Sequence, residues 1–418
     1  MQHRRSFLKS SAMVLAGVAM PGPFLHALQQ PGGTALPDWE RGWLEIHHID
    51  TGRGNATLVL YPDGTSLLID AGEAASAVRT MSQARPNDSR AAGEWIGRYC
   101  ARQLDRVKNP TLDVALLTHL HGDHVGEVRA DSPQSARGDY RLTGISRVAE
   151  MIEIREMIDR GWPDYGYPAP PRDATSLNYM AFAKSLAAKG AKVQRAKAGS
   201  ATQLGLRHDA PRLPNFKARI FSANGAVWSG SGEDAKELFP PVAGLAAAAM
   251  PTENMCSVSL RIDYGAFRYY SGGDLTGDTS YGLYPWHDIE SPVAAAAGPV
   301  SVAVGNHHGY FDACGPAFVR ALRPRVWILP TWSVSQAAMN VLANLYSTEL
   351  YPGPRSVFAT GLPAETLLTT ERFSQNFLSS DGHVVIRVRP DGAEFTVHVV
   401  DARDEGGTVL KTFGPIQA

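Results

Sequence analysis

Four metal-binding side chains stand within six positions of the stretch THLHGDHVGE, residues 118–127: His119, His121, Asp123 and His124. The neutral imidazoles of His119 and His121 can bind one cation, and Asp123 and His124 can bind a second about 3.5 to 4 Å away. Nitrogen ligands with one carboxylate favour Zn²⁺, with Mn²⁺ or Fe as competitors. Cations that share a water lower its pKa towards about 7, so the turn predicts a hydrolytic site with a metal-bound hydroxide.

The residues before this turn indicate how it is held in place. LDVALLT, residues 112–118, is a short apolar run without alternation, which is typical of a strand buried on both faces. The histidine turn follows the carboxyl end of that strand, where layered α/β folds build their sites. The alternative, a polar surface loop that happens to be rich in histidine, explains this combination less well.

The rest of the chain alternates strand and helix signals. A helix is expected over residues 89–108, with Ser89 as its N-cap. Strands or hairpins are expected at 43–50, 56–72, 216–223, 256–274, 325–331 and 383–400, with turns at Asp63-Gly64 and Tyr264-Gly265, and a second helix is expected over 314–324.

The segment from about 129 to 216 interrupts this regular pattern. It is rich in proline and aromatic residues, and we expect an insertion with one or two helices that either overhangs the site or forms a structural flap. Four aromatic residues of the segment either stack on a base or sugar ring or pack in the core: Trp162, Tyr165, Tyr167 and Tyr179. We expect the domain to span residues 41–402, with 403–418 as a C-terminal tail.

The first 30 residues resemble a twin-arginine export signal. Arg4 and Arg5 precede a short apolar run from Ala12 to Met20, which is too short to span a bilayer. Export would place the mature chain in the periplasm or outside the cell, with cleavage between about residues 20 and 32 and no integral membrane segment. The alternative is a basic amphipathic start to the folded domain.

Charge and cysteine content limit the choice of partner. The formal net charge is -1, and loss of three cationic residues with the signal would lower it to about -4. A long nucleic-acid groove normally needs a basic surplus, so a small or short phosphoester fits the composition better than DNA or RNA. Cys100, Cys256 and Cys314 are too few and too scattered for a disulfide framework or a cysteine zinc site, and buried thiols are expected.

The histidine turn resembles the signature of the metallo-β-lactamase superfamily. Four blocks follow in the order found in the metallo-β-lactamase-like domain of the ComEC DNA-uptake family, together covering about residues 43 to 330: 48–72, 112–127, 253–277 and 305–329. The resemblance implies an α/β fold of the αβ/βα metallo-β-lactamase type, two mixed β-sheets flanked by helices. It also implies a site for one or two metal ions at one edge of this sandwich.

The resemblance extends to individual residues. Asp274, in YSGGDLTG, matches the carboxylate that bridges two metals in relatives; by itself it could be an ordinary turn aspartate. His308, in NHHG, matches the last metal-binding histidine, and His307 would contact a phosphate or support the ligands; the reverse assignment stays open.

At one place the chain departs from the superfamily pattern. Where relatives with a complete zinc set carry another histidine, this chain has Glu253 and Asn254. The ComEC-like subgroup also tends to carry asparagine there. The number of metals is therefore open, with Glu253 as a candidate ligand or supporting residue. His208 is a less favoured substitute, expected at the surface.

Asp50, in HIDTG, and Asp70, in LIDAG, each end a predicted strand close to a glycine. In the family such acidic residues mainly hold the metal loops, through hydrogen bonds to backbone donors or to a metal-binding histidine. We therefore expect supporting roles for both, with direct metal binding as the alternative.

These observations predict an exported metal-dependent hydrolase. The residues alone do not indicate its substrate class. The family resemblance favours phosphodiester cleavage, with Asp123 orienting the attacking water or accepting its proton. A lactonase or β-lactamase acting on a carbonyl, and a non-catalytic exported metal-binding protein, are the alternatives. DNA transport is not expected, because the channel segments of ComEC proteins have no counterpart here. The sequence leaves the oligomeric state open.

Overall fold

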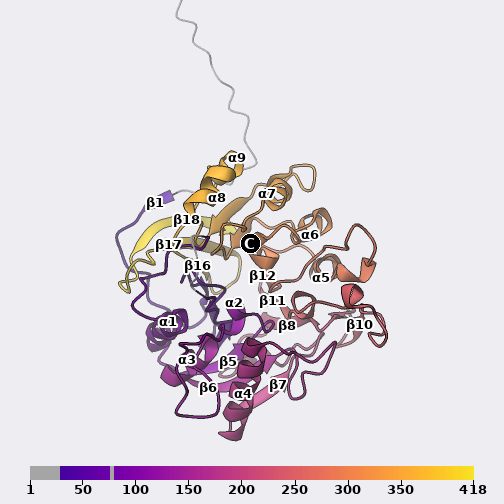
Figure 1. Ribbon diagram of the computed structural model, residues 1–418. Coiled ribbons are helices and arrows are strands. Elements are labelled where there is room, and N and C mark those ends of the chain that lie inside the picture. Colours follow the sequence, from indigo (N-terminus) through magenta and orange to yellow (C-terminus); the bar gives the residue numbers. More distant parts are fainter. Residues whose placement is uncertain (1–28, 76–79) are drawn as a thin grey trace, which may run out of the picture.

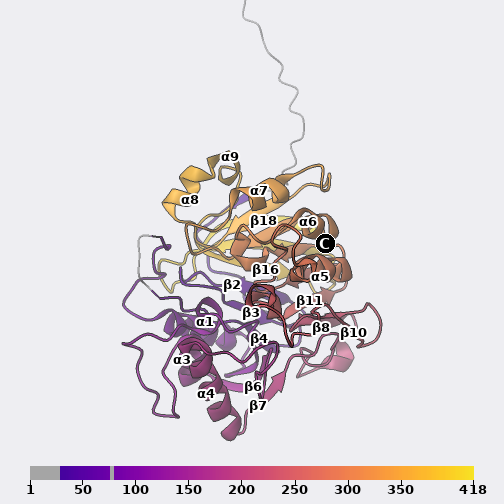
Figure 2. The same cartoon turned by 45° about the vertical axis from the view of Figure 1, so that its right-hand side comes forward.

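Two mixed β-sheets face each other in the computed structural model, which describes residues 29–75 and 80–418, and helices cover the outer faces of both sheets (Figures 1 and 2). The export signal predicted over residues 1–30 lies outside the described residues except for its last two positions. Within the described ranges, no helix is both long enough and apolar enough to cross a membrane.

The first sheet holds ten strands of the described chain. Its central and C-terminal strands pair antiparallel, whereas β4, β5, β6 and β7 run parallel. In spatial order the strands are β1 (Gln29–Pro31), β18 (Val409–Gln417), β17 (Glu394–Val400), β16 (His383–Val388), β2 (Leu44–His48), β3 (Thr57–Leu60), β4 (Ser66–Ile69), β5 (Thr111–Leu116), β6 (Glu153–Asp159) and β7 (Lys192–Arg195).

The second sheet holds eight strands of the described chain and is likewise mixed. The hairpin β11–β12 is antiparallel, and the strands from β12 to β15 run parallel. In spatial order the strands are β10 (Ala235–Glu237), β9 (Ala226–Trp228), β8 (Phe216–Ala223), β11 (Ser259–Tyr264), β12 (Phe267–Ser271), β13 (Val302–Val304), β14 (Val326–Leu329) and β15 (Ser356–Ala359).

Helices complete a four-layer sandwich. α1 (Ala92–Arg106), α3 (Gly144–Met151) and α4 (Ala174–Ala188) pack on the first sheet, and α5 (Glu290–Ala297), α6 (Pro316–Leu322) and α7 (Met339–Tyr346) pack on the second. The short helices are α2 (Gly122–Val125), α8 (Ala364–Thr369) and α9 (Glu371–Ser374). Side chains between the sheets form a third apolar layer, and this burial is the main source of stability.

The position of strand β5 explains why apolar and polar residues do not alternate in its sequence. Val114 and Leu116 point into the layer between the sheets, while Leu112 and Ala115 pack against the helices on the outer face. Both faces are covered, so every second position does not need to be polar. The prediction of a buried strand that leads into the histidine turn is confirmed.

Both predicted hairpin turns are also confirmed, since β3 pairs with β4 around Asp63-Gly64 and β11 pairs with β12 around Tyr264-Gly265. The prediction of Ser89 as the N-cap of the first helix is wrong. Helix α1 follows Ala91, which has no capping side chain. The carboxylate of Glu73, from a distant loop, accepts a hydrogen bond from Gly93 N instead.

Residues 129–216 supply part of the sandwich itself. They contain α3, β6, α4 and β7, so the two strands extend the parallel side of the first sheet. Tyr165 and Tyr179 of this segment are buried, and their hydroxyls donate to Asp159 Oδ2 at 2.5 and 2.8 Å. At the opposite side, the last residues form β18, hydrogen-bonded between β1 and β17.

Candidate metal centre

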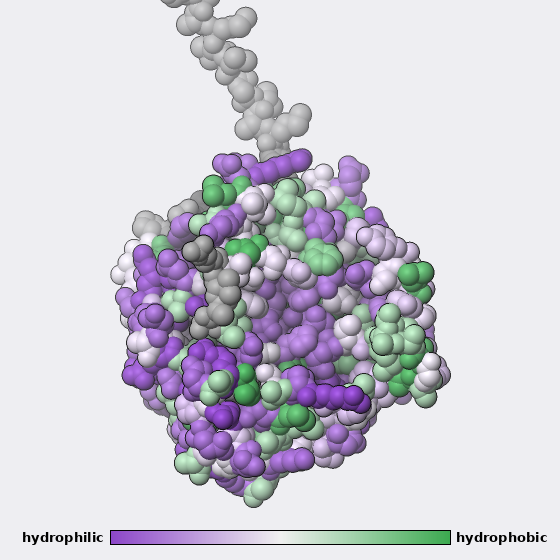
Figure 3. All heavy atoms as spheres, in the orientation of Figure 1, coloured by the Kyte–Doolittle hydropathy of each residue, from purple (hydrophilic) through white to green (hydrophobic). Residues whose placement is uncertain are grey.

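The loops that follow three strands meet at one edge of the sandwich. The histidine turn follows β5 in the first sheet, Asp274 follows β12 in the second, and a 3₁₀ turn at Asn306–Gly309 follows β13. Val258 N donates to Thr118 O at 2.9 Å, which ties the two sheet edges together. The face shown in Figure 3 is hollowed near its middle, close to the end of β12, and the hollow is mainly hydrophilic.

Four residues from these loops place one ligand atom each within 4.8 Å of one another: Asp123, His124, Asp274 and His308, here called the four-residue group. His308 Nε2 lies 3.1 Å from Asp123 Oδ2. His124 Nε2 lies 3.1 Å from Asp274 Oδ1 and 3.2 Å from His308 Nε2. Ligand atoms on a tetrahedral Zn²⁺ with bonds of about 2.0 to 2.1 Å stand about 3.3 Å apart, so this spacing fits the ion.

A second set, the three-residue group, consists of His119, His121 and Asp274. His119 Nε2 lies 3.1 Å from His121 Nδ1 and 3.7 Å from Asp274 Oδ2. His119 is fully buried, whereas His121 is exposed. Asp274 therefore turns Oδ1 towards one group and Oδ2 towards the other, the arrangement of a bridging carboxylate.

Hydrogen bonds on the far side of the imidazoles orient the four-residue group. His124 Nδ1 donates to Asp70 Oδ2 at 2.7 Å, and His308 Nδ1 donates to the carbonyl oxygen of Pro330 at 2.9 Å. In both rings the proton on Nδ1 leaves Nε2 as the free electron pair that points into the group. Such outer partners set the tautomer and raise the basicity of a metal-binding histidine.

Asp70, the acceptor for His124, is itself held by several hydrogen bonds. Its carboxylate accepts from Thr118 N at 2.7 Å, from Thr118 Oγ1 at 2.8 Å and from Asn55 Nδ2 at 3.0 Å. The side chain is buried, and its backbone adopts φ of 61°. Asp70 thus connects the end of β4 to the histidine turn.

Charge in the centre is arranged to hold a cation. Burial alone would lower the pKa of His124, yet carboxylates led by Asp274 and Asp70 outweigh burial and raise that pKa well above its ordinary value. Burial alone would raise the pKa of Asp274, but the imidazoles of His124 and His308 hold it well below. Burial lowers the pKa of His119, which favours its neutral, metal-binding form. The field that attracts a proton to His124 would equally attract a metal ion.

The two residues at the departure from the superfamily pattern lie beside the three-residue group. The Glu253 carboxylate binds the Arg160 guanidinium at 2.5 Å and accepts from Leu120 N at 2.9 Å, so it supports the histidine turn from outside. Asn254 Nδ2 donates to His307 Nε2 at 3.3 Å. Arg160, which is buried, was not singled out in the sequence, and nothing in its local sequence signals this role.

His307 lies at the mouth of the centre, beside the groups and not within them. Its Nδ1 donates to Asp312 Oδ1 at 2.6 Å, and its Nε2 lies 3.7 Å from Asp274 Oδ2. His308 belongs to the four-residue group, and His307 does not. Asp312 was missed, although its place four residues after His308 in GYFDACG could have signalled a partner.

Other candidates lie away from both groups. Asp50 accepts from Gly52 N at 2.9 Å and Gly382 N at 3.3 Å, so it fastens two loops without a recorded contact to a grouped histidine. His208 is partly exposed and contacts Asp113 at 3.1 Å, as expected for a residue outside the centre. Among the described residues, the three cysteines are buried and free, and none joins either group.

Comparison with known proteins points to the same turn. Residues 49–130 match the family model of the metallo-beta-lactamase superfamily. A search of curated protein sequences produced no match. One similar solved structure, from Parabacteroides distasonis, bears a provisional description as a metal-dependent hydrolase; it is 12% identical, with 79% of this chain and 98% of that chain covered and a TM-score of 0.34.

Another similar solved structure is a mutant of the CmlA beta-hydroxylase, 11% identical, with 85% of this chain and 55% of that chain covered and a TM-score of 0.36. This chain thus spans about half the length of that protein. The fold class predicted from the sequence, two mixed sheets flanked by helices in an αβ/βα sandwich, is confirmed by the strand order and the helix layers. The histidine turn lies inside the matched residues 49–130, so the sequence similarity to the metallo-beta-lactamase superfamily model includes the candidate metal ligands of this turn.

Proposed function

We propose that this chain is an exported metal-dependent hydrolase that cleaves a small or short phosphoester, most directly a phosphodiester. One observation carries the proposal: Asp274 offers its two carboxylate oxygens to two separate groups of histidines. A shared carboxylate of this kind is suited to a pair of cations a few ångströms apart. Many enzymes that catalyse nucleophilic displacement at phosphorus use such a pair of metal ions.

The six grouped residues would hold the metal ions, with Zn²⁺ favoured by the histidine-rich donor set and Mn²⁺ or Fe as alternatives. Bound there, the ions would supply Lewis acidity and a water of lowered pKa. Asp123 carries a side chain that is 17% exposed, so its carboxylate can meet solvent. We assign to Asp123 the orientation of the attacking water or the acceptance of its proton.

His307 is placed to help bind the substrate. Its side chain is 18% exposed and is oriented by Asp312, while Asn254 lies on its other nitrogen. Burial alone would lower the pKa of His307, but the charge of Asp274 and the hydrogen-bonded carboxylate of Asp312 outweigh it and raise that pKa. An imidazole at the mouth of the centre, held in place by Asp312 and Asn254, could contact a phosphate oxygen of the substrate.

The choice of substrate class rests on two arguments. The resemblance of the ordered sequence blocks to the ComEC-type domain favours phosphodiesters. The slightly acidic composition disfavours a long nucleic acid, which would need a basic groove. We therefore propose a metabolite-sized or oligomeric phosphoester, and nucleic acid remains a second choice.

The test is metal content by elemental analysis, together with hydrolysis of bis-p-nitrophenyl phosphate, a lactone and a cephalosporin. Asp123→Ala and His121→Ala are compared with His208→Ala, a histidine control outside both groups. We expect about two metals per chain and diester cleavage that only the first two variants lose. Cleavage of carbonyl substrates alone would move the chain to the lactonase or β-lactamase class. Absence of both metal and turnover would leave a non-catalytic protein.

Export is proposed from the sequence alone, because its signal precedes the described residues. Replacing Arg4 and Arg5 by lysine should retain the full-length precursor in the cytoplasm, since twin-arginine recognition depends on the arginine pair. Cell fractionation and the N-terminal sequence of the exported chain measure this. A wild-type chain found only in the cytoplasm would contradict the proposal.

A further inference from the structure

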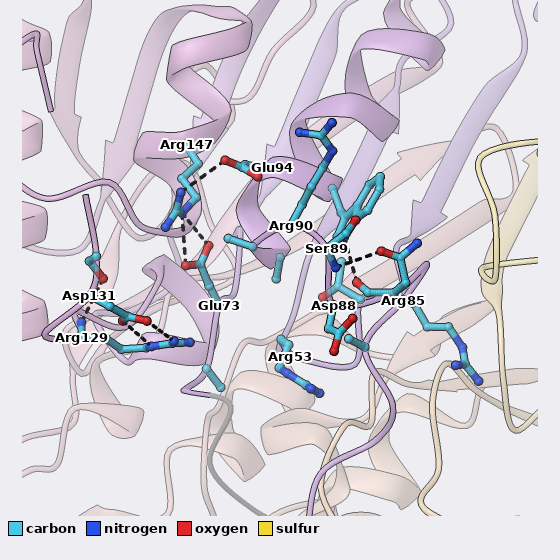
Figure 4. A pocket seen from close by; sticks show the side chains of 18 of the residues that line it. Arg53, Glu73, Arg85, Asp88, Ser89, Arg90, Glu94, Arg129, Asp131 and Arg147 are labelled. Atoms are coloured by element: carbon cyan, nitrogen blue, oxygen red, sulfur yellow. Dashed lines mark hydrogen bonds and ion pairs between the residues drawn. The ribbon is translucent and has the colours of Figure 1, made fainter. Parts of the chain in front are cut away.

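A pocket of about 360 Å³ lies beside the histidine turn, and both arginines and carboxylates line it (Figure 4). The carboxylates are those of Glu73, Asp88, Glu94 and Asp131, and the arginines outnumber them by one. The loop after β2 contributes Arg53, the long loop after β4 contributes Arg85 and Arg90, the segment after α2 contributes Arg129, and α3 contributes Arg147. We call this the arginine pocket. Its volume suits a small organic molecule or one end of a larger one.

Loops that line the arginine pocket are hydrogen-bonded to the histidine turn of the metal centre. Asn55 N, two residues after Arg53, donates to Asp123 O at 2.8 Å, and Ala74 N donates to Arg53 O at 2.8 Å. Arg129 lies six residues after Asp123, in the segment that follows α2. The loops after β2, β4 and β5 thus form the pocket at the sheet edge that also carries the histidine turn.

Three of the arginines already have carboxylate partners. Arg147 contacts Glu73 and Glu94 at 3.2 and 3.4 Å. Arg129 binds Asp131 at 2.7 Å, and Arg85 binds Asp381 at 2.9 Å. These pairs shape the walls of the pocket, and they leave two of its cations to be explained.

Arg53 and Arg90 form no ion pair with a described residue. Arg53 is half-buried, and its Nη1 donates to the carbonyl oxygens of Gly52 and Ser82, both at 2.6 Å. Arg90 is exposed, and its guanidinium lies 5.6 Å from the centre of the Trp95 ring. Asp88 also lines the pocket, without an ion pair to either arginine.

Arg53 is the more informative of the two. Burial lowers its pKa, since a guanidinium drawn away from water loses hydration. Two carbonyl contacts fix one nitrogen, and the remaining donors of the rigid guanidinium fork can meet an anion side-on. The charges of Asp50 and Asp88 raise the pKa of Arg53 by less than burial lowers it, and no described carboxylate lies within ion-pair distance of its guanidinium. A held, partly desolvated arginine of this kind can receive an anion.

We propose that the arginine pocket binds a second anionic group of the substrate, a carboxylate or phosphate distant from the bond that is cleaved at the metal centre. This inference rests on the proposed hydrolase function and specifies it: the substrate would be a phosphoester with an additional negative charge. Arg53 and Arg90 would contact that group, and the Trp95 ring would line the space beside it.

The kinetic test uses two diesters that share the p-nitrophenol leaving group. The second phenyl ring carries a para-carboxylate in one and a neutral para-carboxamide in the other. We expect wild type to favour the carboxylate by roughly tenfold in kcat/KM, the scale of a charge-assisted hydrogen bond. In Arg53→Gln the ratio should fall to about one, while Arg212→Gln, an exposed arginine elsewhere, should keep it. Equal rates in wild type, or a preference that survives Arg53→Gln and Arg90→Gln, would overturn the proposal.

A binding test separates this inference from the proposed function. Metal-depleted full-length chain is titrated with benzoate and with phenyl phosphate in a calorimeter, so the two arms distinguish a carboxylate from a phosphate. Binding of either probe that weakens about tenfold in Arg53→Gln and not in Arg212→Gln supports the pocket, even if no diester is cleaved. Absence of binding, or equal affinity in wild type and Arg53→Gln, overturns it.

Discussion

The two metal-binding groups share Asp274 but have different surroundings. In the four-residue group, His124 and His308 each donate from Nδ1 to a fixed buried acceptor. In the three-residue group, His119 Nδ1 lies 3.2 Å from the Thr118 hydroxyl, and His121 is exposed. The histidines of the four-residue group are thus preorganised for metal binding, whereas the three-residue group contains an exposed histidine that is less firmly held.

The difference teaches that counting ligands is not enough to rank two sites. Preorganised imidazoles lose little freedom when a cation arrives, whereas an exposed histidine must be ordered first. We therefore expect the four-residue group to bind its metal more tightly, and the three-residue group to hold the ion that is lost first on dialysis.

Removal of the shared carboxylate should have the largest effect. Asp274→Ala takes one ligand from both groups and leaves buried imidazoles without their counter-charge. We expect metal content well below one ion per chain and a loss of diester hydrolysis of roughly 10³-fold or more, on the scale of several kcal/mol. Elemental analysis and steady-state kinetics measure this, with circular dichroism as the check that the fold persists. A variant that keeps two ions would refute the bridging role.

Removal of one ligand from each group is the next test. His308→Ala should abolish the tight site, whereas His121→Ala should weaken only the labile one. Loss of a supporting hydrogen bond typically lowers activity by up to roughly 100-fold. We expect His308→Ala to lower activity by more than this, and His121→Ala to lower it by less than His308→Ala does. Competition with a chelator of known affinity gives the two binding constants. The reverse order would show that exposure does not determine which group is weaker.

Asp70→Asn tests the supporting hydrogen bond itself. The amide oxygen can no longer accept with a full charge from His124 Nδ1, so affinity at the four-residue group should fall roughly 10- to 100-fold. Asp113→Asn is the matched control, because Asp113 is a buried aspartate at the other end of β5. That variant should change stability without changing metal affinity. Equal metal losses in both variants would mean that Asp70 acts only on the fold.

Asp50→Asn should have the smallest effect on the metal centre, since Asp50 fastens loops outside both groups. Burial, with the nearby charge of Asp381, raises the pKa of Asp50 to about 7 from an ordinary 3.8. The native chain then binds more protons than the unfolded chain between these values, so Asp50 costs stability as pH rises through this window. The cost is at most about 4 kcal/mol above pH 7.

Asp50→Asn should therefore flatten the decrease in stability between pH 5 and pH 8 and leave metal content unchanged. Urea denaturation at both pH values measures the free energy of unfolding. An unchanged pH dependence would show that the Asp50 carboxyl is ionised throughout this range.

The sequence could predict the groups because their residues stand in short motifs at strand ends. His119, His121, Asp123 and His124 follow a visibly apolar strand, so their convergence needed no knowledge of the whole fold. The position of Asp274 depended on a family resemblance, because an aspartate after glycine is also a common turn residue. The division of these residues into two groups comes from tertiary structure.

Long-range partners could not be predicted in the same way. The N-terminal donors of α1 meet Glu73 and not the neighbouring Ser89, because folding brings a distant loop to the helix end. The unpaired Arg53 and Arg90 are separated by 36 residues in the sequence and share a pocket only after β2 and β4 are placed. Local pattern contains no signal for either arrangement.

The backbone conformation of the turn after β13 affects which part of the chain unfolds locally first. His307 and His308 adopt φ of 47° and 55°, in the left-handed region that non-glycine residues occupy at a cost of about 1 to 3 kcal/mol each. Without a cation, hydrogen bonds such as that from His307 N to Gly273 O must hold this conformation. When a chelator removes the metal ions, amide hydrogen exchange should therefore accelerate first at residues 306–309. The strands of the two β-sheets, which are covered on both faces, should stay protected.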